Sequence, residues 1–379
     1  MKSRNLFGTV LSAIFLLAAT SAAALGQNGP AADGLPTGDP KDSPPSLSET
    51  TADQSPCAGN CDLDCFPSCC PRWTASADFI ILDRVGGGNQ TLVEKVLHSV
   101  PFHEVPKTPG VEVFNSSDFQ QGFCGGPSLD LTRHGDNGYD LELSYFQIDG
   151  WTSGISIGPD PNYWLVMRAP GGFTQTTQHV QTQAMVWDYD SQLYNAEFNV
   201  RWNPCDRVTM LAGFRWVNLS ESLVGTLNPP TFPWEQSWTF WNGTTTNNLY
   251  GFQIGADGKL WERGRFSIGA LVKAGIFDNN AEQTAEVSVI AKRQRTASAS
   301  TNAAAFVGET GLRCEFQLTR RVVLKAGYEA IWLQGVALAP QQVQEIYSSI
   351  HPIAAQALGV NCDSGVFYHG ATAGLEYSF

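Results

Sequence analysis

The last stretch of the sequence, residues 366–379, alternates between two kinds of side chain. One set is mostly apolar and comprises Phe367, His369, Ala371, Ala373, Leu375, Tyr377 and Phe379. A period of two predicts a β-strand with one apolar face. A strand that ends on an exposed aromatic ring is typical of a transmembrane β-barrel, whose lipid face carries aromatic side chains at the membrane interface. We therefore expect an all-β protein of this class.

The beginning of the sequence is consistent with export. Lys2 and Arg4 precede an apolar run from Leu6 to Thr20, and small residues follow, so residues 1–24 are predicted to be a cleaved signal peptide. Residues 25–56 are rich in Pro, Gly, Ser, Asp and Thr, a composition that predicts a disordered tether. No other run approaches about 18 apolar residues, which excludes a spanning helix. The sequence thus predicts an outer-membrane location, with the barrel formed by residues 73–379.

A cysteine-rich segment, residues 57–72, precedes the first predicted strand and is expected in the periplasm. Its cysteines are Cys57, Cys61, Cys65, Cys69 and Cys70. An oxidising compartment favours disulfides among them, while a metal site or free thiols remain alternatives, because steps of four differ from the usual zinc spacing. The chain has nine cysteines, so at least one is unpaired or bonded to another chain.

Period-two alternation recurs along the rest of the chain and predicts an antiparallel, up-and-down barrel of ten strands, with twelve as the alternative. The strands are expected near residues 73–82, 128–132, 139–149, 194–202, 208–216, 250–256, 266–276, 306–318, 322–332 and 366–379. An even number of antiparallel strands is typical of bacterial outer-membrane barrels.

The predicted connections alternate in length. Short turns are expected at 133–138, 203–207, 257–265 and 319–321, and long loops at 84–120, 150–189, 220–247, 278–303 and 334–365. Outer-membrane barrels have short periplasmic turns and long extracellular loops. This places Asn242 and Gln342 in extracellular loops, and Asp136 and Asp206 in periplasmic turns.

The predicted outward faces carry aromatic residues at two heights. Those expected at the periplasmic end are Trp73, Tyr139, Trp202, Phe266, Phe316 and Phe379, and those near the extracellular end are Tyr145, Trp216, Tyr250, Trp332 and Phe367. Such girdles suit Trp and Tyr rings at the level of lipid headgroups. The alternative is a soluble secreted β-sheet protein that buries these rings in its core and binds carbohydrate or protein partners.

The opposite faces carry charges of both signs. The residues predicted to line the lumen are Asp78, Asp140, Glu142, Glu197, Arg201, Arg215, Lys273, Glu309, Arg313, Glu315, Lys325 and Glu329, joined by Asp130 and Glu376. Opposite charges inside a lumen tend to pair and plug it. About eight strands fill their interior with side chains and about sixteen leave an open pore, so ten or twelve predict a narrow channel or none.

The search for catalytic motifs does not favour an enzyme. None of the six histidines has a serine two positions later, and no HExxH, GxSxG, Walker A or GxGxxG context occurs. We expect no catalytic residues, cofactor or metal site. A net charge of -13 makes nucleic acid an improbable partner.

Three segments resemble a known family. They are residues 69–82, which read Cys-Cys-Pro-Arg-Trp-Thr-Ala-Ser-Ala-Asp-Phe-Ile-Ile-Leu, the Leu-Ala-Gly-Phe-Arg-Trp at 211–216, and the Gly-Leu-Glu-Tyr-Ser-Phe at 374–379. They are similar to bacterial outer-membrane porins of the beta-barrel porin family seven type, over about residues 70–379. The resemblance implies contact with outer-membrane lipid and either a narrow channel for small hydrophilic solutes or a structural surface protein. Resemblance to outer-membrane barrels also implies that the barrel-assembly machinery recognises Leu375, Tyr377 and Phe379. The oligomeric state is open.

Overall fold

The computed structural model describes residues 72–379 except 87, 102–103, 106–107, 168–181, 206, 229–238, 290–292 and 343–358. These residues belong to one compact unit, Cys65–Phe379. The predicted signal peptide, tether and five clustered cysteines lie outside the described residues, and so does Asp206. Within the described part, no helix is long and apolar enough to cross a membrane.

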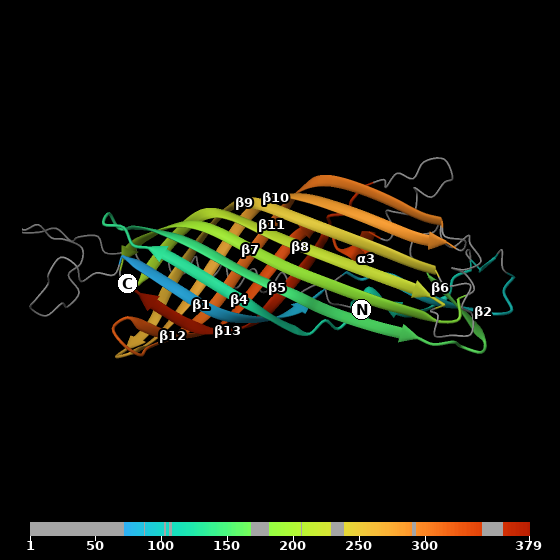
Figure 1. Ribbon diagram of the computed structural model, residues 1–379, viewed down its shortest axis with the longest axis horizontal. Coiled ribbons are helices and arrows are strands. Elements are labelled where there is room, and N and C mark those ends of the chain that lie inside the picture. Colours follow the sequence, from blue (N-terminus) through green and yellow to red (C-terminus); the bar gives the residue numbers. More distant parts are fainter. Residues whose placement is uncertain are drawn as a thin grey trace, which may run out of the picture. The chain divides into compact units, whose positions relative to one another are not determined.

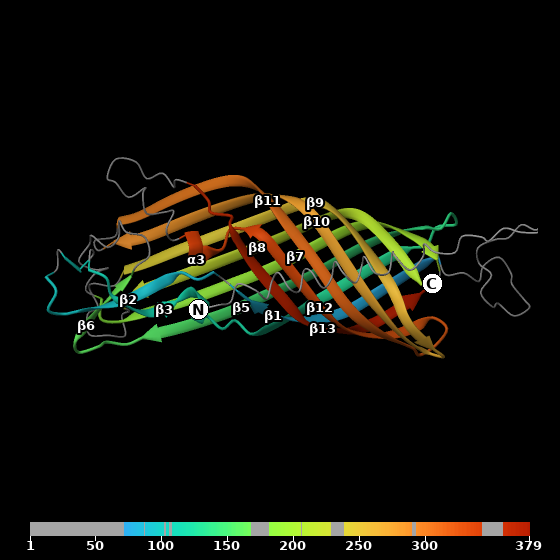
Figure 2. The ribbon, with the colours of Figure 1, turned by 180° about the vertical axis from the view of Figure 1, so that it is seen from behind.

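Ten antiparallel strands form a closed barrel (Figures 1 and 2), which confirms the predicted fold class and strand number. The strands are β1 (Trp73–Val85), β4 (Phe123–Arg133), β5 (Tyr139–Ile157), β7 (Met185–Cys205), β8 (Val208–Leu227), β9 (Thr239–Arg263), β10 (Phe266–Val289), β11 (Arg293–Gln317), β12 (Val322–Val336) and β13 (Ser364–Ser378). Each strand pairs with its neighbour in the chain, and β1 pairs with both β4 and β13. Closure gives every barrel strand a partner on both sides, although β11 pairs with β12 only from Phe306 to Gln317 and with β10 along nearly its whole length.

The seam between β1 and β13 extends to the last residue of the sequence. The backbone N–H of Phe379 donates to the carbonyl oxygen of Trp73 at 2.9 Å, and its carbonyl oxygen accepts from the N–H groups of Arg72 and Trp73 at 3.0 Å. The ring of Phe379 stacks on that of Tyr377, with centroids 5.9 Å apart. Phe379 therefore contributes both backbone hydrogen bonds and an aromatic contact to closure of the barrel.

The two ends of the barrel differ in their connections. At one end, here called the turn end, residues 206–207 join β7 to β8 and residues 264–265 join β9 to β10. The predicted turn over 257–265 is thus too long, because β9 continues past Gly258 with a register shift opposite Ile268 and Gly269. At the other end, the loop end, the expected loops over 220–247 and 278–303 are mostly strand. Asn242, for instance, lies within β9.

A second, three-stranded sheet forms from residues that were expected to be loops. It has the order β3-β2-β6, where β2 is Thr91–Leu97, β3 is Val111–Asn115 and β6 is Tyr163–Met167. A single turn of 3-10 helix, η2 (Ser116–Asp118), follows β3 and is capped by Asn115. Apolar side chains of this sheet pack with those of the barrel strands at the loop end, including Phe114, Met167, Trp187 and Trp241.

Each long strand reverses its polarity partway along its length. In the half of β7 nearer the turn end, Phe198, Val200 and Trp202 face outward and are exposed, while the side chains between them are polar and face inward. Towards the loop end, Asp188 and Asp190 face outward and apolar side chains face inward. The inward-facing apolar residues of this half are Met185, Trp187, Tyr189 and Leu193, each at most 1% exposed.

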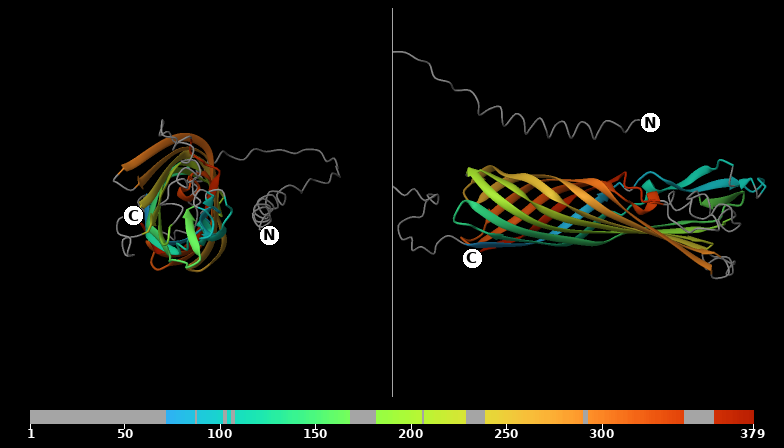
Figure 3. Two further views of the ribbon diagram at one scale, coloured as in Figure 1. Left: turned by 90° about the vertical axis from the view of Figure 1, so that its right-hand side faces the viewer. Right: turned by 90° about the horizontal axis from the view of Figure 1, so that it is seen from above.

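The same reversal occurs at one level on the neighbouring strands. The last apolar or aromatic outward residues before it are Trp216 on β8, Tyr250 on β9 and Ile276 on β10, and the next outward residues are Asn218, Asn248 and Asp278. A strand in lipid needs an apolar outer face, whereas a strand in water needs a polar outer face and an apolar core. The barrel, drawn in two further views in Figure 3, thus consists of a lipid-facing belt at the turn end and a water-facing extension at the loop end.

At the end of β12 the chain turns into the barrel. Gly335 has φ of 84°, and a Cβ there would lie 2.5 Å from the carbonyl oxygen of Ala304, so only glycine permits this turn. Residues 336–339 follow with no exposed surface and lead into a single helical turn, α3 (Ala339–Gln342). We call residues 335–342 the inward segment. The prediction that Gln342 lies in an exposed loop is wrong, because its side chain hydrogen-bonds inside the barrel and is 1% exposed.

The position of the lipid-facing belt predicts a difference between two outward residues of β10. We expect Ala270→Arg, within the belt, to lower the free energy of unfolding by about 2–4 kcal/mol. The same change at Thr284, which faces outward beyond the reversal, is expected to cost less than about 0.5 kcal/mol. Urea unfolding in lipid vesicles, followed by tryptophan fluorescence, measures both. Equal losses at the two positions would contradict the assigned belt.

Candidate functional site

The barrel interior next to the turn end is polar, and it gathers the residues predicted to line a lumen. All of them lie on inward-facing positions: Asp78, Asp130, Asp140, Glu142, Glu197, Arg201, Arg215, Lys273, Glu309, Arg313, Glu315, Lys325, Glu329 and Glu376. They come from nine different strands. Their even or odd spacing along each strand is sufficient to place them inside, because side chains of a strand alternate between its two faces.

Four charged residues form a buried cluster in the middle of the barrel. Lys273 Nζ lies 3.0 Å from Glu197 Oε2 and 3.1 Å from Glu309 Oε1. Arg215 Nη1 lies 2.8 Å from Glu309 Oε2, and its Nε lies 3.4 Å from Glu197 Oε1. Because two acids face two bases from β7, β8, β10 and β11, each charge has two opposite partners. We call these four residues the central charge cluster.

Amide side chains complete the bonding of the cluster. Gln253 donates to Glu197 at 2.7 Å and to Asn199 at 2.9 Å, and Asn199 donates to Glu197 at 3.0 Å. Arg215 donates to Asn195 at 2.6 Å. Buried ions are tolerated where opposite charges and hydrogen bonds satisfy them. These amides were not among the predicted lumen residues, although they have the same inward alternation as Glu197 and Arg215.

A second set of ion pairs lies closer to the turn end. Arg201 pairs with Glu142 and with Asp257, the latter at 3.2 Å, and Arg313 pairs with Asp257 at 2.5 Å. On the opposite side, Lys325 Nζ lies 3.4 Å from Asp78 and 3.6 Å from Glu376. Asp257 was missed from the sequence because it was assigned to a turn. Three of these pairs, Arg201–Asp257, Arg313–Asp257 and Lys325–Asp78, join strands that are not neighbours in the barrel.

The polar interior encloses a cavity of about 140 Å³. Its walls include members of both sets of ion pairs, such as Glu197, Lys273 and Arg313, together with hydroxyl side chains, such as Ser128 and Thr132. A volume of this size holds a few water molecules or one small solute. The cavity is therefore polar, as expected of a porin lumen, but its volume is small.

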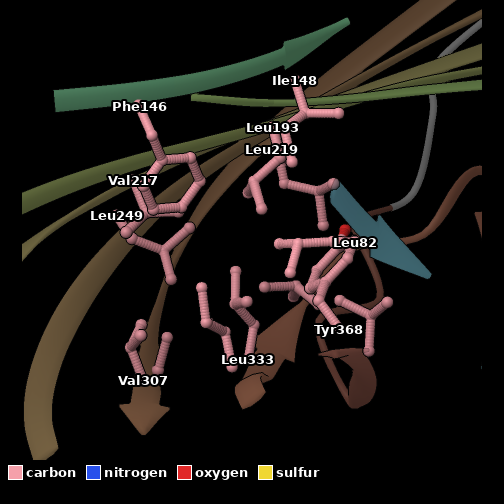
Figure 4. Packing of buried hydrophobic residues seen from close by; sticks show 14 of the residues in the cluster. Leu82, Phe146, Ile148, Leu193, Val217, Leu219, Leu249, Val307, Leu333 and Tyr368 are labelled. Atoms are coloured by element: carbon pink, nitrogen blue, oxygen red, sulfur yellow. The ribbon is translucent and has the colours of Figure 1, made fainter. Parts of the chain in front are cut away.

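Towards the loop end the interior becomes apolar and closed. Side chains from opposite sides of the barrel point toward one another in Figure 4, among them Phe146, Leu219 and Leu333. The members of this cluster, here the apolar plug, are Ile80, Leu82, Phe146, Ile148, Trp151, Leu193, Val217, Leu219, Leu249, Phe277, Ala305, Val307, Ile331, Leu333, Val336, Leu338, Val366 and Tyr368, each at most 7% exposed. Val336 and Leu338 belong to the inward segment. The apolar plug separates the polar cavity from the loop end.

Comparison with protein families matches residues 179–379 to the family described as Putative beta barrel porin-7 (BBP7). The chain belongs to this family. The family and the closed barrel make the chain an outer-membrane β-barrel protein, either a channel or a surface protein. No curated protein matches the sequence.

Solved structures with a similar fold include other membrane barrels. The outer membrane protease OmpT from Escherichia coli has 11% identity and a TM-score of 0.37, over 81% of this chain and 96% of that chain. The toluene transporter TodX from Pseudomonas putida has 11% identity and a TM-score of 0.33, over 81% and 90%. A FadL homologue from Pseudomonas aeruginosa has 11% identity and a TM-score of 0.29, over the same shares. Likenesses at this level do not bear on the activity of the BBP7 chain.

A further buried ion pair in this BBP7 barrel joins the apolar plug to the loop end. Arg84 pairs with Glu221, and their side chains are 2% and 0% exposed. Arg84 also donates to the hydroxyl of Tyr189 at 2.8 Å, and Glu221 accepts from the backbone N–H of Ala339 at 2.9 Å. The pair thus links β1, β7 and β8 to the inward segment. The pair was not predicted, because both residues fall at the edges of predicted loops.

His134 lies in a hydrogen-bonded chain at the turn end. Its Nε2 is 2.8 Å from the hydroxyl of Thr74, and its Nδ1 is 3.0 Å from Asp140. Hydroxyl, imidazole and carboxylate in this order also occur in hydrolase triads, which need free N–H groups for an oxyanion. The backbone N–H groups beside Thr74, those of Arg72 and Trp73, are both bonded to the carbonyl oxygen of Phe379. We interpret these hydrogen bonds between side chains as a structural contact that holds β1 to the β4–β5 turn.

The cysteines that the structure describes are all unpaired. They are Cys124, Cys205, Cys314 and Cys362. No disulfide joins Cys124, on β4, to Cys362, in the segment before β13. Cys314 is exposed on the outward face of β11, within the lipid-facing belt.

Proposed function

We propose that this BBP7 protein is a closed outer-membrane barrel that carries a rigid β-structure at the cell surface, with its turn end in the periplasm. The observation that carries the proposal is the apolar plug, which fills the interior beyond the polar cavity. Water and ions cross a barrel only through a continuous polar path. The described interior interrupts that path with side chains that are almost fully buried.

The inward segment supports closure because its backbone is bonded to the barrel wall. The side chain of Asn247, on β9, accepts from the N–H of Ala337 at 2.7 Å and donates to its carbonyl oxygen at 2.8 Å. Asn279, on β10, donates to the carbonyl oxygen of Gly335 at 3.0 Å. Buried backbone groups of a segment without regular structure must find such partners. The segment is therefore built into the fold.

The water-facing extension supports a role at the surface. The strands β8 to β11 continue past the belt with polar outward faces, and the small sheet of β2, β3 and β6 packs against the barrel strands at the loop end. Long strands with an apolar core form a stiffer support than flexible loops. This arrangement suits a protein whose extended strands and small sheet form a rigid surface outside the membrane.

A second candidate function is restricted passage of small hydrophilic solutes. The polar cavity of about 140 Å³, with charges of both signs in its wall, favours it. Passage would require the inward segment to leave the barrel. The absence of enzymatic activity and of any cofactor stays a prediction.

Conductance in a planar bilayer distinguishes the two candidates. We expect the refolded wild-type protein to show no steady current, because the apolar plug has no path for ions. An unrelated open porin in the same bilayer is the control for the assay. A steady unitary current through the wild-type protein would overturn the closed-barrel proposal in favour of the channel.

A variant of Asn247 tests whether the inward segment maintains closure. Asn247→Ala leaves the N–H and carbonyl groups of Ala337 buried without their partner, which is expected to weaken the segment by about 2–4 kcal/mol. We expect intermittent current from this variant. Thr246→Ala, whose side chain faces outward on the same strand, is the matched control and should stay silent.

A further inference from the structure

The charges exposed at the turn end have the opposite sign to those of the whole protein. The sequence has a net charge of -13, yet the turn end carries a group of exposed bases, here called the basic rim. Its members are Arg72, Arg133, Arg207, Lys259, Arg263, Arg265, Arg320 and Arg321. The exposed acids described at this end are Asp136 and Glu262, of which Glu262 pairs with Lys259 at 3.3 Å. The basic rim therefore has a large excess of positive charge.

Among the side chains that the structure describes, the outward surface of the water-facing extension has the reverse balance. Exposed acids on β5, β7 and β10 there are Asp149, Asp188, Asp190, Asp278 and Glu282. The two surfaces lie on either side of the lipid-facing belt. Because of this separation of charge, the layer of lipid headgroups at the turn end contacts basic side chains, and the layer on the other side of the belt lies next to acidic side chains.

Two members of the basic rim lie beside outward-facing aromatic residues at the edge of the belt. Arg133 on β4 pairs in register with Trp73 on β1, and Arg263 on β9 pairs with Phe266 on β10. The guanidinium of Arg133 lies over the ring of Trp73, with its carbon 5.9 Å from the ring centroid. Outward Trp and Phe side chains mark the level of lipid headgroups. These arginines therefore lie where headgroup phosphates lie.

We propose that the basic rim binds the headgroups of anionic phospholipids in the leaflet at the turn end. A guanidinium presents several N–H donors that match phosphate oxygens, and a basic group near an anionic membrane surface is attracted to it. The rim is continuous with the lipid-facing belt, which favours lipid over an anionic polymer that would approach from the aqueous side. The inference goes beyond the proposed function and holds for a closed or a conducting barrel.

The test compares lipid selectivity of the protein with that of a neutralised variant. The variant carries Arg263→Gln, Arg265→Gln, Arg320→Gln and Arg321→Gln. All four positions are exposed; Arg263 ends β9 and the other three lie in the β9–β10 and β11–β12 turns. The full chain is refolded into phosphatidylcholine vesicles that contain spin-labelled phosphatidylglycerol or spin-labelled phosphatidylcholine. The association constants of the two labelled lipids at the protein surface are then measured by electron paramagnetic resonance.

We expect wild-type protein to prefer phosphatidylglycerol by about fivefold or more, the factor for one basic residue near an anionic surface. The preference should fall at least twofold in the variant, which keeps four of the eight bases of the rim, and in wild type it should fall at high salt. Asp188→Asn, Asp190→Asn, Asp278→Asn and Glu282→Gln together form the control, which should keep the preference. Equal affinity of wild type for the two lipids would overturn the proposal. So would an undiminished preference in the variant, or binding of the rim to purified cell-wall polymer without lipid preference.

Discussion

Glu197→Gln is expected to lower the free energy of unfolding of the barrel by about 3–5 kcal/mol, because it leaves buried positive charge without its partner. Glu197 faces Lys273 at 3.0 Å and Arg215 at 3.4 Å, and its side chain is 2% exposed. In the variant the two bases share the single carboxylate of Glu309. Urea unfolding of the refolded protein in vesicles, with the shift in gel mobility between folded and unfolded forms as the readout, gives the difference.

The matched control for this prediction is Glu315→Gln. Glu315 also lies on an inward position and contacts Arg313 at 3.1 Å, but its side chain is 31% exposed. Water screens a pair at this depth, so the loss is expected to be at most about 1 kcal/mol. A similar loss at both positions would show that the central charge cluster contributes no more to stability than an exposed ion pair.

Deletion of Phe379 is expected to prevent accumulation of the barrel in the membrane of cells. The deletion removes the hydrogen bonds of Phe379 with Arg72 and Trp73 and its ring contact with Tyr377. Unpaired backbone groups in lipid cost several kcal/mol each, so a seam that opens at this end is not tolerated. The measurement is the amount of heat-modifiable protein in outer-membrane fractions.

Phe379→Ala separates closure of the barrel from recognition of the aromatic ring. This variant keeps the backbone hydrogen bonds, so we expect it to refold in detergent almost like wild type. If the assembly machinery reads Leu375, Tyr377 and Phe379, its yield in cells should still fall strongly. Phe367→Ala, on the same face of β13 at the loop end, should keep its yield. Unchanged yield of the Phe379→Ala protein in cells would show that the ring is not an assembly signal.

The sequence by itself predicted the ten barrel strands within the lipid-facing belt and the faces on which their side chains lie, but not the continuation of these strands beyond the belt or the sheet of β2, β3 and β6. Alternation is a local property, because each residue of a strand points opposite to the one before it. Glu197 and Arg215 could therefore be placed inside, and Trp202 and Phe316 outside, without knowledge of their neighbours. The same local pattern contained the polarity reversal, since Leu193 is in phase with Asn195 and Glu197. It was missed because most of the segments beyond the belt, such as 220–247 and 278–303, were assigned to loops.

Only the tertiary structure decided which charges pair and what fills the barrel. Glu197 meets Lys273 because β7 and β10 face each other across the interior, a relation between strands 76 residues apart that no local pattern contains. The inward segment was taken for part of an exposed loop, since its short apolar run has no periodicity of its own. It is buried because the barrel encloses an apolar space at that level, and because Asn247 and Asn279 there bind its backbone. Closure of the interior thus depends on side chains that come together only when all ten strands are in register.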